Sequence, residues 1–306
     1  MFFPSVGGIE TVSFCLAEGY VKLGHDCTVI TRTKAISVDS FPFTISRNPS
    51  SSEKIQLILS HDIIHCNGAS LELVFLAFRY KKPIVWTHAG YQLISIDGLG
   101  WYEGNPSPLS PWRSYLFHKN QIGFMRASKE FSKLWLRRFA SHFITKHVAI
   151  TKWVANRQNL SNQIIIYNPF PLSRFANAEG ENHEFDFFFL GRLVSEKGVG
   201  TFIRAFALFL ERNLAYNKNI LVIGDGNWRL KLEAYAKELK IDQRVRFVGK
   251  LTGDDLLTWV EKGKIAVIPS EWEEPMGGVA LEMLSAGKPV IVSENGGLAE
   301  IGRAHV

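Results

Sequence analysis

The sequence predicts an α/β protein with two domains, each built around a parallel sheet. Short apolar runs that suit strands alternate with amphipathic runs that suit helices, and this alternation is typical of parallel sheets. A chain of 306 residues exceeds one typical core and favours about two domains. Residues 1–168 carry 18 Lys+Arg against 10 Asp+Glu, a net +8, whereas residues 169–306 carry 17 against 19, a net −2. We therefore predict domains at 1–168 and 169–306.

Composition narrows the function classes. Hydrophobic residues make up 46% and charged residues 21% of the chain, as in a globular protein, and no apolar run reaches the ~18–20 residues that span a bilayer. No secretory leader is expected, and Cys15, Cys27 and Cys66 are odd in number and far apart, so we expect reduced thiols and a cytoplasmic protein. The net charge of +6 is concentrated in residues 112–152, with nine Lys+Arg and one acidic residue. That local charge predicts no nucleic-acid partner.

Residues 269–300 carry the strongest functional pattern. A strand ending in Pro269-Ser270 leads through an acidic loop to Gly277-Gly278, where a helix begins. A helix N-terminus after paired glycines is a natural seat for an anion. Glu274 lies before that helix and Glu282 lies inside it. Two carboxylates that flank an anion seat suit a ligand with sugar hydroxyls on both sides of a phosphate, which describes a nucleotide sugar.

This stretch resembles the E-x7-E signature of retaining glycosyltransferases of the GT-B architecture, and specifically of family 4. The resemblance implies two Rossmann-like domains that face each other across a cleft. It implies transfer of a hexose from a UDP- or GDP-sugar to a hydroxyl acceptor, with retention at the anomeric carbon. Glu274 would then bind the donor sugar as a catalytic residue, and Glu282 would bind the ribose.

The second domain contains three more segments that resemble the family. Residues 191–198 match the family pattern G-R-x4-K-G, and Arg192 and Lys197 in it would neutralise the diphosphate leaving group. Gly224 begins a G-x-G turn that resembles the family's turn near the nucleotide; a full dinucleotide fingerprint fails at Arg229, which argues against a dehydrogenase. Residues 245–263 resemble the family's F-x-G segment, in which the backbone at 247–250 would bracket the base.

No cofactor or metal is expected. The sequence has no D-x-D motif and no His/Cys cluster with metal-ligand spacing. The resemblance agrees, because GT-B enzymes usually act without a metal. The phosphate charge would then be met by Arg192, Lys197 and the helix mouth at Gly277 and Gly278.

Two features of the first domain enter the prediction. Gly7 and Gly8 resemble the family's P-x-x-G-G opening, which implies that they approach the donor phosphates; a plain tight turn is the alternative. His88 falls at the carboxyl end of a predicted strand, where the family carries a histidine that faces the reacting sugar. His88 is our catalytic candidate on the acceptor side, and the alternative is a structural histidine with its hydrogen bonds satisfied.

The first domain also offers surfaces for an acceptor and a membrane. Residues 91–111 form a Gly/Pro-rich loop that suits acceptor binding. Residues 112–147 are expected to be helical, with Phe124, Phe131, Leu134 and Trp135 on one face and basic residues on the others. This segment could meet the anionic inner leaflet, or it could be a core-facing helix with a solvated basic side. The resemblance favours the membrane, because many relatives glycosylate lipid-linked or lipopolysaccharide acceptors.

Both ends look truncated against the family pattern. Most of the first strand is expected to be missing, the second domain is expected to lack its C-terminal part, and residues 301–306 look non-biological.

Two other functions stay open: a nucleotide-sugar 2-epimerase of the same architecture, and a non-catalytic fragment that binds a nucleotide sugar or a membrane. The sequence identifies neither the donor sugar nor the acceptor.

Overall fold

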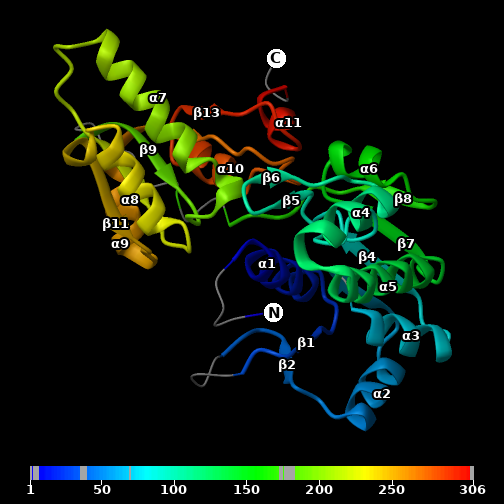
Figure 1. Ribbon diagram of the computed structural model, residues 1–306. Coiled ribbons are helices and arrows are strands. Elements are labelled where there is room, and N and C mark those ends of the chain that lie inside the picture. The colour runs from blue at the N-terminus through cyan, green and yellow to red at the C-terminus, as the bar shows by residue number, and fades with distance from the viewer. Residues whose placement is uncertain are drawn as a thin grey trace. The chain divides into compact units, whose positions relative to one another are not determined.

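A computed structural model describes residues 2, 7–34, 40–68, 70–171, 175 and 183–303, with side chains as far as 301. The chain divides into two compact units (Figure 1). The first consists of Met1–Gly100 and Ser107–Pro171, and the second of Trp101–Pro106 and Leu172–Val306. Of the predicted first strand only Phe2 is described, and residues 172–174, 176–182 and 304–306 also lie outside the described residues.

The first unit contains a two-stranded and a four-stranded parallel sheet, with strand orders β1-β2 and β3-β4-β7-β8. Its elements are α1 (Gly8–Lys22), β1 (Thr28–Thr31), β2 (Thr44–Arg47), α2 (Ser51–Ser60), β3 (Ile64–Asn67), α3 (Leu71–Arg79), β4 (Ile84–His88), α4 (Pro111–Ile122), α5 (Phe124–Ser141), β7 (Lys146–Ala149), α6 (Lys152–Gln158) and β8 (Gln163–Ile165). Trp86 on β4 is fully buried in the core that α3 and α5 cover. Cys15, Cys27 and Cys66 are free thiols; Cys66 is buried, and burial raises its pKa to about 12.

The second unit contains a five-stranded, fully parallel sheet with strand order β11-β10-β9-β12-β13. Its elements are β5 (Trp101–Tyr102), β6 (Asn105–Pro106), β9 (Phe185–Leu190), the 3-10 turn η2 (Ser195–Lys197), α7 (Val199–Arg212), β10 (Ile220–Ile223), α8 (Arg229–Glu238), the 3-10 turn η3 (Asp242–Arg244), β11 (Val245–Gly249), α9 (Gly253–Glu261), β12 (Gly263–Ile268), α10 (Gly278–Ser285), β13 (Val290–Val292) and α11 (Leu298–Arg303). Strands β5 and β6 form a separate antiparallel hairpin.

Residues of the five-stranded sheet alternate between two cores. On β10, Leu221 and Ile223 join the core beneath α9, α10 and α11, whereas Ile220 and Val222 join the core beneath α7 and α8. Successive side chains of a strand point to opposite faces. The continuous apolar run of β10 therefore reflects a strand that is buried on both faces, as in doubly wound folds.

One local prediction needs correction, and two elements were not predicted. The helical segment 112–147 is two helices, α4 and α5, because the chain breaks at Gly123 with φ 83°. No element was predicted in the stretch that contains β2 and α2. A capping box of Ser50 with Glu53 begins α2, and this S-x-x-E signal was readable in the sequence.

Candidate active site

The five-stranded sheet has a topological switch point between β9 and β12. The chain proceeds from β9 to β10 on one side and from β12 to β13 on the other, so the loops that follow β9 and β12 diverge. In open parallel sheets, ligands bind in the crevice outside the carboxyl ends at such a point. The loops concerned are residues 191–198 and 269–277, which contain the predicted donor-site residues Arg192, Lys197 and Glu274.

Lys197 and Glu274 join these two loops. The Lys197 Nζ donates to Glu274 Oε1 at 2.5 Å, and Ser270 Oγ donates to Glu274 Oε2 at 2.5 Å. The side chains of Lys197 and Glu274 are 17% and 10% exposed. The cation and the carboxylate of this pair are therefore both largely withdrawn from water, where charges act more strongly than at an open surface.

Gly198 and Gly224 allow close approach between the backbone segments that follow the strands of this sheet. Gly198 has φ 67°, and a Cβ added there would overlap the carbonyl of Pro269 on the other loop. Gly224 has φ 143°, and a Cβ there would overlap the carbonyl of Gly191. Both glycines are thus required by backbone packing within the protein, whatever ligand the loops bind.

Arg192 extends the charged site toward solvent. Its side chain is 67% exposed, and its Nη2 lies 3.5 Å from Glu196 Oε1. An exposed guanidinium with one long ion pair keeps donors available for a second anion. Sequence reasoning placed Arg192 and Lys197 on one loop, and the structure agrees.

Helix α10 begins directly after the second loop. Gly277 is its N-cap and provides no side-chain cap, and Gly278 is its first residue. A Cβ on Gly277 would overlap Leu298 of α11, so this glycine also permits close packing. Glu282 lies on α10 and is partly buried.

Two side chains that sequence reasoning missed belong to this site. Ser270 holds Glu274, as described above. Trp272 lies beneath Lys197, whose Nζ is 5.5 Å from the ring centroid. The Trp272 indole nitrogen is buried and has no hydrogen-bond partner among the described residues. In the sequence, the available signal for Ser270 and Trp272 was that both follow shortly after the end of β12.

His88 lies at the carboxyl end of β4, as predicted, and is 1% exposed. Its Nε2 is 2.9 Å from His147 Nδ1, and its ring stacks on Trp86 at 5.0 Å. Since His147 Nε2 faces the carbonyl of Ser141 at 3.2 Å, it carries the hydrogen; a neutral His147 then accepts at Nδ1 from His88 Nε2.

Burial and the neighbouring His147 lower the pKa of His88 to about 3. His88 is therefore neutral near pH 7, and its Nδ1 is left without a proton. An unprotonated Nδ1 can accept a hydrogen bond from a hydroxyl. The catalytic role of His88 stays a prediction, and its burial equally suits the structural alternative.

Gly7 and Gly8 lie at the N-terminus of α1 in the first unit. Gly7 is the N-cap, and the Glu10 carboxylate lies against it. A Cβ on Gly8 would meet nothing within 4 Å. The space around Gly8 is compatible with a nearby ligand, and the predicted donor contact of both glycines stays a prediction.

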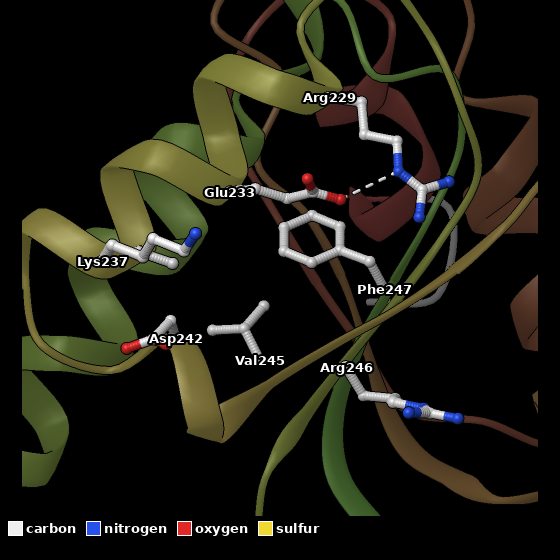
Figure 2. Close-up of a pocket in the computed structure, with 8 residues that line it drawn as sticks. Arg229, Glu233, Lys237, Asp242, Val245, Arg246 and Phe247 are labelled. Atoms are coloured by element: carbon white, nitrogen blue, oxygen red, sulfur yellow. Dashed lines mark hydrogen bonds and ion pairs between the residues drawn. The ribbon is translucent and has the colours of Figure 1, made fainter.

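A separate pocket of about 300 Å³ opens beside α8 and β11. Figure 2 shows Arg229 and Glu233, which are joined at 2.9 Å, beside the ring of Phe247, while Arg246 points away. The lining mixes cations and carboxylates; it includes Phe247 of the predicted base-binding segment 247–250, but none of the charged residues predicted to bind the donor. Within the described part of the chain, no group of three or more His, Cys, Asp or Glu side chains is arranged to hold a metal ion.

Two family models match the chain. Glycosyltransferase Family 4 matches residues 6–174, and Glycosyl transferases group 1 matches residues 173–306. A glycosyltransferase of Methanocaldococcus jannaschii, MJ1607, is 40% identical, and the match covers 97% of this chain and 79% of that protein. A 42.6 kDa protein of the cps region of Klebsiella pneumoniae is 24% identical over 99% of this chain and 86% of that protein.

Solved structures match the fold. Anabaena Alr3699/HepE, in complex with UDP and glucose, matches with a TM-score of 0.65 and 17% identity, over 96% of this chain and 79% of that chain. WaaG, a glycosyltransferase involved in lipopolysaccharide biosynthesis, matches with a TM-score of 0.60 and 19% identity, over 99% and 82%. The expected α/β GT-B fold class is thereby confirmed. By its family matches, this chain belongs to glycosyltransferase family 4 and is an enzyme that transfers sugars.

Proposed function

We propose that the enzyme transfers a hexose from a UDP- or GDP-sugar to a hydroxyl acceptor, with retention at the anomeric carbon. The observation that carries this proposal is the Lys197–Glu274 pair at the switch point of the second sheet. A pyrophosphate needs cations near its oxygens, and a hexose needs acceptors for its hydroxyls. The pair provides both within one largely buried site.

Each charged residue of the site has a role that follows from its chemistry. Lys197 and Arg192 neutralise the charge that develops on the leaving diphosphate, and the N-terminus of α10 adds backbone N–H donors. Glu274 accepts hydrogen bonds from hydroxyls of the donor sugar, while Ser270 holds its second oxygen. Glu282 accepts from the ribose. The complex of HepE with UDP and glucose supports a UDP-sugar among the candidate donors.

Replacement of Lys197 by alanine tests this function. Loss of a cation at a developing phosphate charge is expected to lower donor turnover by about 10²–10³-fold. Turnover is measured as release of UDP or GDP from a panel of nucleotide sugars. Lys262→Ala is the matched control, because Lys262 lies in the same unit over the ring of Trp259. Near-normal turnover by the Lys197 variant would refute the phosphate role.

We further propose that α4 and α5 bind an anionic membrane surface, which would place the enzyme at lipid-linked or cell-surface acceptors. Exposed aromatic and aliphatic side chains on these helices include Trp112, Leu116, Phe124, Met125 and Phe139, each at least 57% exposed. Arg113, Lys119, Arg126 and Lys129 are exposed among them. This combination suits partial insertion of aromatics beside anionic headgroups. Leu134, expected on the same face, is fully buried and anchors α5 to its own unit.

Vesicle binding tests the membrane proposal. Each basic residue near an anionic surface contributes about 1 kcal/mol, so Arg126→Glu with Lys129→Glu should weaken binding to phosphatidylglycerol-containing vesicles by at least about tenfold. Lys237→Glu with Lys264→Glu makes the same charge change on the second unit and should leave binding intact. Equal loss in both variants would mean that net charge alone governs binding. No helix among the described residues is long and apolar enough to cross a membrane.

A further inference from the structure

A short hairpin in the middle of the first unit's sequence belongs to the second unit. Strands β5 and β6 are joined by Glu103 and Gly104, with φ 45° and 91°, and positive φ at both turn residues matches the tight turns that favour hairpins. Trp101 on β5 is 6% exposed, and its Nε1 donates to Ser195 Oγ at 2.9 Å. A Cβ on Gly104 would contact Trp228 at 3.6 Å. The hairpin is thus packed against the unit that contains the charged site.

The hydrogen bond of Trp101 has a fixed direction. An indole nitrogen only donates, so Ser195 Oγ accepts and keeps its own hydrogen to donate. Ser195 Oγ lies 3.4 Å from Glu196 Oε2, and Glu196 Oε1 lies 3.5 Å from Arg192. A single relay therefore runs from Trp101 through Ser195 and Glu196 to the exposed guanidinium of Arg192.

The same bond orders the turn that carries Lys197. Ser195, Glu196 and Lys197 form the 3-10 turn η2, and Ser195 and Glu196 are both at least 91% buried. The backbone carbonyl of Glu196 accepts from the N–H of Glu271 on the second loop at 3.0 Å. A side chain that fixes Ser195 thus limits the positions open to Arg192 and Lys197 together.

The base of the hairpin is held independently by Asp97. Its Oδ1 accepts from the N–H groups of Leu99 and Gly100, both at 2.7 Å, just before the hairpin. Its Oδ2 accepts from Ser107 Oγ, just after the hairpin, and lies 3.1 Å from His118 Nε2. One largely buried carboxylate therefore joins the residues just before the hairpin to the residue just after it.

We propose that Trp101 is a positioning residue for the donor site: its indole N–H orients Ser195, and through Ser195 it holds the 192–197 loop in the arrangement that binds pyrophosphate. This inference rests on the proposed function, because the pyrophosphate is the ligand it assumes. Trp101 acts through Ser195 and need not touch the donor. Residues 91–111 were expected only to bind the acceptor, and this proposal gives part of that loop a role toward the donor.

A double-mutant cycle with UDP and GDP as calorimetric ligands tests the inference. Trp101→Phe removes the N–H and retains a ring, and we expect the Kd of the bound nucleotide to rise about fivefold, as for one lost hydrogen bond. Ser195→Ala should raise the Kd similarly. The double variant should bind no more weakly than the weaker single variant, because both changes break one relay. Trp259→Phe, the same change elsewhere in the unit, should leave the Kd unchanged.

The outcomes separate this inference from the proposed function. An unchanged Kd for Trp101→Phe, with binding abolished by Lys197→Ala, would overturn the positioning role and leave the function intact. Additive losses in the double variant would also overturn it, since they would show that Trp101 and Ser195 act separately. A wild-type protein that binds neither UDP nor GDP would overturn both.

Discussion

The two units have parallel sheets in common but differ in what their strand ends present. In the second unit, the loops after β9 and β12 place an ammonium and a carboxylate 2.5 Å apart in a largely buried site. In the first unit, β4 ends in a neutral histidine that is stacked on Trp86 and bonded to His147. Parallel strands therefore lead to a charged pair in one unit and to a neutral, packed histidine in the other. Strand topology identifies where a site can form, and side-chain charge and burial decide whether it does.

The largest expected difference between the units is the loss of stability when a glycine is replaced by alanine. Gly224→Ala should destabilise the second unit by about 3 kcal/mol or more, because its φ of 143° suits only glycine and its Cβ would overlap Gly191. Gly8→Ala in the first unit meets open space at the start of a helix and should change the free energy of unfolding by no more than about 1 kcal/mol. Urea denaturation measures both. Equal effects would show that Gly224 is not under backbone constraint.

Removal of the charge of Glu274 should lower donor turnover more than removal of the charge of Glu271. Glu274→Gln removes the partner of Lys197 and should lower donor turnover about 30-fold, in keeping with about 2 kcal/mol for a charge-assisted hydrogen bond. Glu271→Gln is the matched control, because Glu271 is exposed and bonds Thr201. Rates of UDP or GDP release report both. If the two variants lose activity equally, the loop as a whole matters and the pair does not.

Acid should destabilise the first unit through its buried histidines. Burial lowers the pKa of His65, His88 and His147 below the usual 6.5, to about 3 for His88. The unfolded chain then binds more protons than the folded one between about pH 6.5 and the folded pKa. Stability therefore falls as the pH drops through this window, by up to about 1.4 kcal/mol per pH unit for each histidine.

His88→Gln checks this acid effect while keeping a hydrogen-bond donor toward His147. Urea denaturation of wild type and variant at about pH 7 and about pH 5 should show a smaller loss of stability in the variant. In the described part of the second unit, the histidine His183 is only partly buried, so hydrogen exchange should locate the acid-sensitive opening in peptides of the first unit. Acid sensitivity located in the second unit would contradict the assignment.

The smallest expected effect concerns His118 and Asp97 at the base of the hairpin. The pKa of His118 is shifted in the direction opposite to that of the buried histidines. Burial alone would lower the pKa of His118, but the bonds to Asp97 and to the carbonyl of Ser114 outweigh it and raise that pKa. A raised folded pKa stabilises below about pH 6.5 and is lost as the pH rises through the folded value. Asp97 itself has a lowered pKa, because the bonds from His118, Ser107, Gly100 and Leu99 outweigh its burial, so its stabilisation is lost at acid pH.

Asp97→Asn should weaken the contacts of residue 97 at the base of the hairpin by about 1 kcal/mol. The amides of Leu99 and Gly100 should then exchange several-fold faster near pH 6, with a smaller difference at higher pH, where His118 is already neutral. Hydrogen exchange followed by mass spectrometry resolves these amides. Unchanged exchange would show that the backbone bond from Ser107 N–H to Gly100 carbonyl suffices.

Parts of the fold and site followed directly from sequence. The apolar runs of β9, β10 and β12 were readable because each strand is buried on both faces. Arg192, Lys197 and Glu274 were proposed from their match to the family's motifs, and the structure brings Lys197 and Glu274 into contact. The break at Gly123 and the short strand β2 were missed, since a single glycine between two helical segments does not by itself end a helix and β2 has only four residues.

The sequence by itself determined the α/β class and the charged loops, because local periodicity and short spacing carry that information, and its resemblance to the family led to the prediction that these loops bind a nucleotide sugar. Only the tertiary structure decided that Lys197 bonds Glu274, that His88 is buried against His147, and that Trp101 reaches Ser195. These partners lie 77, 59 and 94 residues apart in the chain. Contacts over such separations depend on how strands order themselves in a sheet, which no local pattern records.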